Sequence, residues 1–181
     1  MLPLLCEIAT IMASQYPSPL SRITLSLLMK DPASVSRLTL APTWVIGSGL
    51  FIVGAYIRKV CYATLGRLFT YQLTVLKDHK LVTSGPYSVV RHPGYSGMIM
   101  TLVGMVMMEY LPGSYLAESG SLDGPWAKAC LMVWIVCFMG VPAGGFVRRV
   151  SMEDEVLRKE FGSEWEEWAK KTPYKLLPLV Y

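Results

Sequence analysis

The sequence of 181 residues is poor in charge and contains no asparagine. Asp, Glu, Lys and Arg make up 17% of the chain, whereas soluble domains carry about 25%. The absence of asparagine excludes N-glycosylation. The formal net charge is only +4 and the basic residues are scattered, which argues against nucleic-acid binding. With 52% hydrophobic residues and a mean hydropathy of +0.40, the composition predicts an integral membrane protein.

Metal ligands and disulfide partners are also scarce. The chain has four cysteines, none in a C-x-x-C pair, and two histidines. A structural zinc site needs about four clustered Cys or His ligands, so we expect no metal. Nothing in the cysteine spacing indicates a disulfide scaffold, and three of the four cysteines lie in apolar stretches.

Two apolar stretches open the chain, at 1–16 and 17–32, and both are interrupted by proline. Each is shorter than the ~20 residues that span a bilayer as a helix. A helical hairpin, a re-entrant pair and interfacial helices all remain open for residues 1–41.

Three longer apolar stretches follow, with expected spans at about 42–60, 93–111 and 125–147. Pro42 suits the first turn of a helix. Gly47, Gly49 and Gly54 would let a second helix approach closely. The sequence therefore predicts an all-α integral membrane protein, a polytopic bundle of about four to five membrane helices.

Lysine and arginine are distributed unevenly among the connections. They are frequent in 58–92 and from 148 onward, whereas 112–124 has none. By the positive-inside rule, 58–92 and the tail 148–181 face the cytosol, and 93–147 forms a hairpin. The tail has helical periodicity, which Gly162 should break. Its Trp and Lys residues suit a cytosolic helical segment at the membrane interface.

Both histidines lie in one polar stretch, "KDHKLVTSGPYSVVRHPGYSG" (77–97). Turns are expected at Gly85-Pro86 and Pro93-Gly94, where exposed backbone groups can bind a small polar ligand. Tyr87 and Tyr95 offer aromatic faces that attract cations such as a sulfonium by ~0.5–2 kcal/mol. The stretch is either a plain loop between spans or a cofactor site at the membrane surface.

Arg149 and Glu153 stand four residues apart just after the last apolar stretch. On a helix they would share one face. They could form a surface salt bridge worth less than about 1 kcal/mol. Alternatively, they could extend the site at 77–97, because both segments emerge on the same side of the membrane.

Two segments together resemble the isoprenylcysteine carboxyl methyltransferase family. They are "LGRLFTYQLTVLKDHKLVTSGPYSVVRHPGYSG" and the tail "RVSMEDEVLRKEFGSEWEEWAKKTPYKLLP". The resemblance covers roughly 54–178, and its specificity lies in the combination of H-x-L-V, G-x-Y, R-H-P-x-Y and R-x-x-x-E at these spacings. The motif R-H-P alone would be weak evidence for this resemblance.

The resemblance implies a catalytic domain over 42–181 that uses S-adenosylmethionine. Family members methylate the C-terminal carboxylate of a prenylated cysteine, in the endoplasmic reticulum membrane and from the cytosolic side. Arg149 matches the arginine that orients the substrate carboxylate. The positions that match cofactor-binding residues are Gln72, His79, Leu81, Val82, Tyr87, His92, Pro93, Tyr95 and Glu153, with Lys80 and Gly94 acting through their backbone.

The sequence departs from the family in two places. The region before residue 42 is short for the extra spans that many members carry. The acidic cluster reads E-D-E, so Glu155 could share the role of Glu153.

Three other functions remain open. A phospholipid or other small-molecule methyltransferase would use a related cofactor motif. Its amine substrate must lose a proton before it attacks, so its site needs a base and should not carry an arginine near the nucleophile. The ending "WAKKTPYKLLPLVY" also resembles sterol reductases, which bind NADPH and are much longer. A non-catalytic membrane scaffold is the third.

Overall fold

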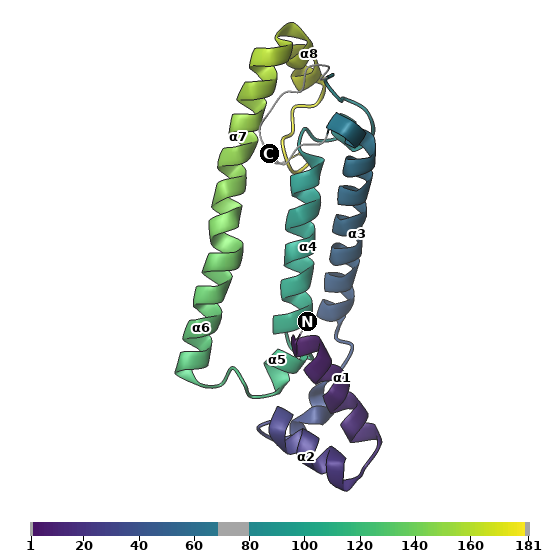
Figure 1. The fold of residues 1–181 in the computed structure, drawn as a ribbon, viewed down its shortest axis with the longest axis vertical. Coiled ribbons are helices and arrows are strands. Elements are labelled where there is room, and N and C mark those ends of the chain that lie inside the picture. Colours follow the sequence, from purple (N-terminus) through teal and green to yellow (C-terminus); the bar gives the residue numbers. More distant parts are fainter. Residues whose placement is uncertain (1, 69–79, 180–181) are drawn as a thin grey trace. The chain divides into compact units, whose positions relative to one another are not determined.

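The computed structural model describes residues 2–68 and 80–179, and within them every regular element is helical (Figure 1). The sequence prediction of an all-α chain is confirmed for this part. The elements are α1 (Leu2–Gln15), α2 (Pro19–Leu28), η1 (Pro32–Arg37), α3 (Pro42–Leu65), η2 (Gly66–Leu68), η3 (Gly85–Ser88), α4 (Pro93–Tyr110), α5 (Tyr115–Glu118), α6 (Pro125–Ile135), the π-helical turn η4 (Val136–Gly140), α7 (Val141–Phe161) and α8 (Ser163–Lys171).

Two helical stretches of the described chain are long and apolar enough to cross a membrane. They run over Pro42–Leu68 and Pro93–Glu118. Only 17% and 22% of their most apolar windows are buried inside the protein. A core helix of a soluble protein would be mostly buried, so these exposed apolar surfaces fit an apolar solvent better than water. As predicted, α3 begins at Pro42, whose fixed φ and missing N–H suit the first helical turn.

The chain forms two compact units, of which the first comprises Met1–Phe51 and Leu102–Phe138. In it, α1 packs on α2. The hydroxyl of Tyr115 donates to the carbonyl of Leu28 over 2.7 Å, and the N–H of Lys30 donates to Ser119 over 2.9 Å. These bonds fasten the end of α2 to the segment around α5.

Glycines set the spacing of α3 and α4 in each unit. In the first unit, a Cβ on Gly47 would lie 2.9 Å from the carbonyl oxygen of Gly104. In the second unit, a Cβ on Gly54 would lie 2.4 Å from the carbonyl oxygen of Gly97. The close approach predicted at Gly47 and Gly54 is confirmed. It is wrong for Gly49, where a Cβ would meet nothing within 4 Å, because Gly49 faces away from α4.

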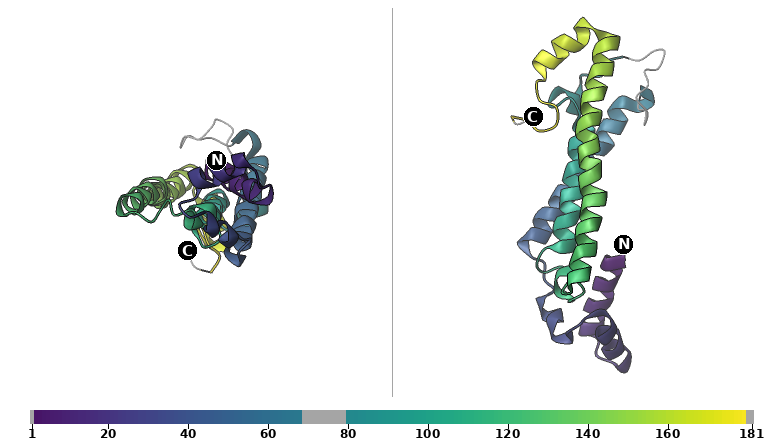
Figure 2. Two further views of the ribbon diagram at one scale, coloured as in Figure 1. Left: turned by 90° about the horizontal axis from the view of Figure 1, so that it is seen from below. Right: turned by 90° about the vertical axis from the view of Figure 1, so that its left-hand side faces the viewer.

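The second unit comprises Ile52–Thr101 and Met139–Tyr181. Within it, α7 continues without a break into the tail and ends at Phe161 (Figure 2). Gly162 has φ of +50°, a conformation that side chains disfavour, and α8 begins immediately after it. The predicted break at Gly162 is confirmed. This turn allows α8 to fold back, so that Trp165 and Trp168 are buried.

The glycine contacts predict a position-specific effect of added methyl groups. Gly54→Ala should lower the free energy of unfolding by about 1–3 kcal/mol, because the methyl group meets backbone atoms that cannot move aside. Gly49→Ala is the matched control and should leave stability unchanged or raise it by up to about 1 kcal/mol. Thermal unfolding in detergent measures both. Equal unfolding temperatures for the two variants would contradict the close packing of α3 against α4 at Gly54.

Candidate functional site

The start of α4 supplies the first half of a polar cluster. Pro93 is the first residue of α4, and His92 stands just before it with only 4% of its surface exposed. The carbonyl of His92 accepts hydrogen bonds from the N–H groups of Tyr95 and Ser96, which begin the helix. The turn at His92-Pro93 therefore fixes the His92 ring beside the first turn of an apolar helix.

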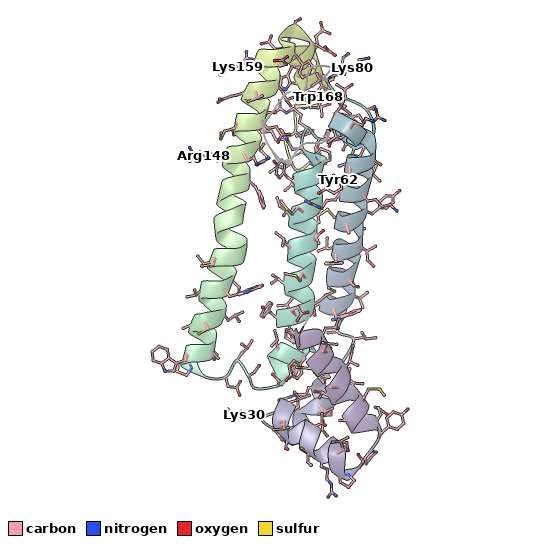
Figure 3. All side chains as sticks on the ribbon, viewed as in Figure 1. Lys30, Tyr62, Lys80, Arg148, Lys159 and Trp168 are labelled. Carbon is pink, nitrogen blue, oxygen red and sulfur yellow. The ribbon has the colours of Figure 1, made fainter. Side chains whose placement is uncertain are left out.

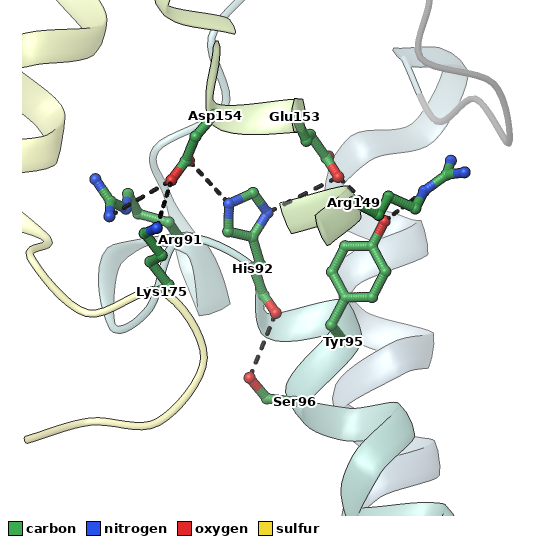
Figure 4. Close-up of polar contacts among 8 residues, drawn as sticks. All are labelled: Arg91, His92, Tyr95, Ser96, Arg149, Glu153, Asp154 and Lys175. Atoms are coloured by element: carbon green, nitrogen blue, oxygen red, sulfur yellow. Dashed lines mark hydrogen bonds and ion pairs between the residues drawn. The ribbon is translucent and has the colours of Figure 1, made fainter. Parts of the chain in front are cut away.

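The middle of α7 supplies the second half (Figure 4). Nε of Arg149 donates to the hydroxyl of Tyr95 over 2.7 Å, and that hydroxyl donates to Oε2 of Glu153 over 3.2 Å. The same Oε2 lies 3.9 Å from Nδ1 of His92. The structure thus brings His92, Tyr95, Arg149 and Glu153 together, and the four-residue spacing on α7 does place the last two on one face.

Asp154 belongs to the same cluster, although it is not among the site residues predicted from the sequence. Its Oδ1 lies 2.9 Å from Nε2 of His92, and its Oδ2 lies 3.5 Å from Arg91. Only 10% of its side chain is exposed, whereas Glu155 is exposed. Asp154 follows fully buried Val150 by four residues and so shares its face of α7, but the sequence alone does not show which residues lie opposite that face.

The C-terminal strip 172–178 closes around the same turn. The N–H groups of Arg91 and His92 donate to the carbonyls of Tyr174 and Lys175, each over 2.9 Å. The side chain of Ser96 donates to the carbonyl of Leu176. This C-terminal strip therefore forms one wall of the cluster.

Trp168 on α8 braces the turn that carries Tyr87. The indole N–H of Trp168 (labelled in Figure 3) donates to the carbonyl of Tyr87 over 3.2 Å. Only 6% of the Trp168 surface is exposed. Burial raises the pKa of the Tyr87 phenol far above its ordinary value, and the neighbouring Cys61 adds to the shift. The phenol therefore stays protonated at neutral pH and can donate a hydrogen bond.

The remaining predicted site residues are placed as follows. Leu81 and Val82 are half-buried, Lys80 is exposed, and the carbonyl of Gly94 accepts from Arg58 over 3.3 Å. Gln72 and His79 lie outside the described residues. In the described part of the chain, no group of three or more His, Cys, Asp or Glu side chains is placed to hold a metal ion.

The two acids of the cluster differ in what they can still bind. Asp154 is surrounded by the side chains of His92, Arg91 and Lys175. Glu153 accepts from Tyr95, and 33% of its side chain remains exposed. A partly exposed carboxylate beside two aromatic rings suits a small cation such as an ammonium or sulfonium.

The brace on the Tyr87 turn can be tested directly. Trp168→Phe removes the indole donor and leaves the Tyr87 carbonyl without this partner, which should cost about 1–3 kcal/mol of stability. Thermal unfolding in detergent should show a lower midpoint by about 2–4 °C per kcal/mol. Trp126→Phe is the control, because Trp126 is 83% exposed. An unchanged midpoint for Trp168→Phe would exclude the brace.

Comparison with known proteins gives consistent matches. Residues 46–116 match the family model described as "Isoprenylcysteine carboxyl methyltransferase (ICMT) family". A rice protein (Oryza sativa subsp. japonica), named as a probable protein-S-isoprenylcysteine O-methyltransferase, is 34% identical over 137 residues, 75% of this chain and 61% of its own. Protein-S-isoprenylcysteine O-methyltransferase B of Arabidopsis thaliana is 31% identical over 72% of this chain and 58% of its own.

A more distant relative extends the match to fungi. Protein-S-isoprenylcysteine O-methyltransferase of Schizosaccharomyces pombe is 28% identical over 73% of this chain and 48% of its own. The chain thus spans about half to three fifths of the length of these relatives. No solved structure matches significantly. The matched residues, which include the turn at His92 and the start of α4, show that the chain belongs to the isoprenylcysteine carboxyl methyltransferase family.

Proposed function

We propose that this chain transfers a methyl group from S-adenosylmethionine to the C-terminal carboxylate of a prenylated cysteine in a protein or peptide. The observation that carries the proposal is the contact of Arg149 and Glu153 with Tyr95, next to His92. This contact places Arg149, a cation that can bind a carboxylate, beside Glu153, an acid that can bind a cationic cofactor. Family membership supports the cofactor and the substrate class.

The chemistry requires alignment rather than proton transfer. S-adenosylmethionine, when bound, supplies a methyl group on a sulfonium that a carboxylate oxygen accepts as the S–C bond breaks. The substrate carboxylate has a reference pKa of ~3.5, so it is ionised at neutral pH and no general base is needed. The protein must orient the carboxylate and exclude water from it.

Each residue of the cluster has a role in this proposal. The guanidinium of Arg149 holds the substrate carboxylate, and its Nε bond to Tyr95 fixes its orientation. Glu153 binds the cofactor's ammonium group, while the rings of His92 and Tyr95 line the same place. Tyr87 and the 80–82 segment are assigned to the cofactor by resemblance, as are Gln72 and His79.

The setting of the cluster suits a substrate with a lipid tail. His92 and Tyr95 stand at the end of an apolar helix that is long enough to cross a membrane. We place this end at the cytosolic face of the endoplasmic reticulum, in a bundle of about four to five membrane helices with the catalytic domain at 42–181. There a prenyl chain remains in the bilayer while its carboxylate reaches the polar cluster.

The arginine disfavours the rival function that methylates an amine. An amine substrate must lose a proton to a base before it attacks, and the guanidinium of Arg149, which stays protonated, cannot be that base. Membranes containing the chain are therefore assayed with labelled S-adenosylmethionine and N-acetyl-S-farnesylcysteine. Parallel reactions contain N-acetylcysteine, phosphatidylethanolamine vesicles, or a sterol with NADPH. We expect methyl transfer to the farnesylated compound alone. Methyl transfer to the phospholipid would show a phospholipid methyltransferase instead, and NADPH oxidation would show a sterol reductase.

Arg149 is the residue on which turnover should depend. Arg149→Ala should reduce methyl transfer to N-acetyl-S-farnesylcysteine by at least about 100-fold, because the carboxylate loses its orienting partner. Binding of S-adenosylmethionine, followed by calorimetry, should change much less. Arg148→Ala is the matched control on the adjacent, exposed position (Figure 3). Near-normal turnover by Arg149→Ala would remove Arg149 from the mechanism.

Glu153 and Glu155 can be separated by matched substitutions. Glu153→Gln keeps the shape but removes the charge, so S-adenosylmethionine should bind about 10-fold more weakly, a loss of about 1.4 kcal/mol. Glu155→Gln changes an exposed side chain and should leave affinity unchanged. The opposite ranking in calorimetry would assign the cofactor's ammonium group to Glu155.

A further inference from the structure

Asp154 holds one particular nitrogen of the His92 ring. Its Oδ1 lies 2.9 Å from Nε2 of His92, with 10% of the Asp154 side chain and 2% of the His92 side chain exposed. Arg91 at 3.5 Å and Lys175 at 4.0 Å both form ion pairs with Oδ2. An ionised carboxylate can only accept, so the hydrogen of this bond must sit on Nε2.

The main chain fixes the position from which the His92 ring projects, and the bond to Asp154 fixes the orientation of the ring. The His92 N–H is fixed by the carbonyl of Lys175, and the His92 carbonyl is fixed by Tyr95 and Ser96. A ring flip would give up the bond to Asp154 in a buried place, at a cost comparable to a lost charged hydrogen bond. Nδ1 therefore stays directed toward Oε2 of Glu153, 3.9 Å away (Figure 4).

We infer that Asp154 is a positioning residue that sets the tautomer of His92. With hydrogen on Nε2, the neutral ring presents the Nδ1 lone pair on the side of Glu153 and Tyr95. There Nδ1 accepts a hydrogen bond from the ammonium group of S-adenosylmethionine, beside the Glu153 carboxylate. This assignment of the ligand rests on the proposed function, whereas the tautomer rests on the contacts of Asp154 alone.

Asp154→Asn is the decisive variant because it keeps the shape and exchanges an acceptor for a donor. Arg91 and Lys175, which face Oδ2, should keep the amide oxygen on their side, so the NH₂ group faces Nε2. The ring hydrogen then moves to Nδ1 and the lone pair facing Glu153 is lost. Asp154→Glu keeps the acceptor and should rescue the wild-type tautomer. Glu160→Gln is the matched control, an acid-to-amide change at an exposed position of the same helix.

The tautomer can be read by nitrogen NMR of the full chain in detergent with labelled histidine. The sequence has only two histidines, and His92→Gln identifies the signals of His92. Spectra are recorded on ligand-free protein at about pH 8.5, two units above the reference histidine pKa of about 6.5. We expect hydrogen on Nε2 in the wild type, in Asp154→Glu and in Glu160→Gln, and on Nδ1 in Asp154→Asn.

Cofactor binding and turnover complete the test. In Asp154→Asn, affinity for S-adenosylmethionine should fall about 10-fold, and its KM should rise more than kcat falls. A lower unfolding midpoint with the wild-type tautomer and affinity would reduce Asp154 to a structural residue and overturn the inference. Wild-type protein that neither binds S-adenosylmethionine nor transfers methyl groups would overturn the proposed function, while the ligand-free spectra would still decide the tautomer.

Discussion

Burying an ionised side chain is costly unless it finds partners, and this constraint organises the second unit. Asp154 on α7 satisfies it with His92 and Arg91, which precede α4, and with Lys175 in the C-terminal strip. Three segments far apart in the sequence must therefore meet at one carboxylate. Because the backbone of 91–92 is also bonded to 174–175, the position of His92 is fixed by both its ring and its main chain.

The same constraint gives two adjacent acids different roles. Successive residues on a helix are separated by about 100°, so Glu153 and Asp154 face different surroundings. Asp154 is enclosed by basic side chains, whereas Glu153 shares the hydroxyl of Tyr95 with Arg149 and stays partly exposed. Asp154 thus joins three segments of the chain, whereas the carboxylate of Glu153 stays partly accessible to a ligand. A single acidic cluster can thus supply both stability and binding.

Local signals made much of this arrangement predictable. Pro42 and Gly162 mark a helix start and a helix break through their own backbone preferences, and the spacing of Arg149 and Glu153 requires only helical periodicity. The face of Gly49 and the role of Asp154 were not predictable in this way. Both depend on which residues of a distant segment lie opposite, namely α4 for Gly49 and the Arg91-His92 turn for Asp154.

The position of the cluster also limits which substrates make physical sense. Charged and aromatic groups gather where an apolar helix begins, and that helix is long and apolar enough to cross a membrane, with 22% of its most apolar window buried. Under the proposed function, a fully water-soluble substrate would gain nothing from an adjoining bilayer, and a fully apolar one could not accept hydrogen bonds from the guanidinium of Arg149. A molecule with a long apolar tail and an anionic end satisfies both surroundings at once. In the proposed function its carboxylate would reach the cluster already ionised, so the protein would contribute orientation and the exclusion of water.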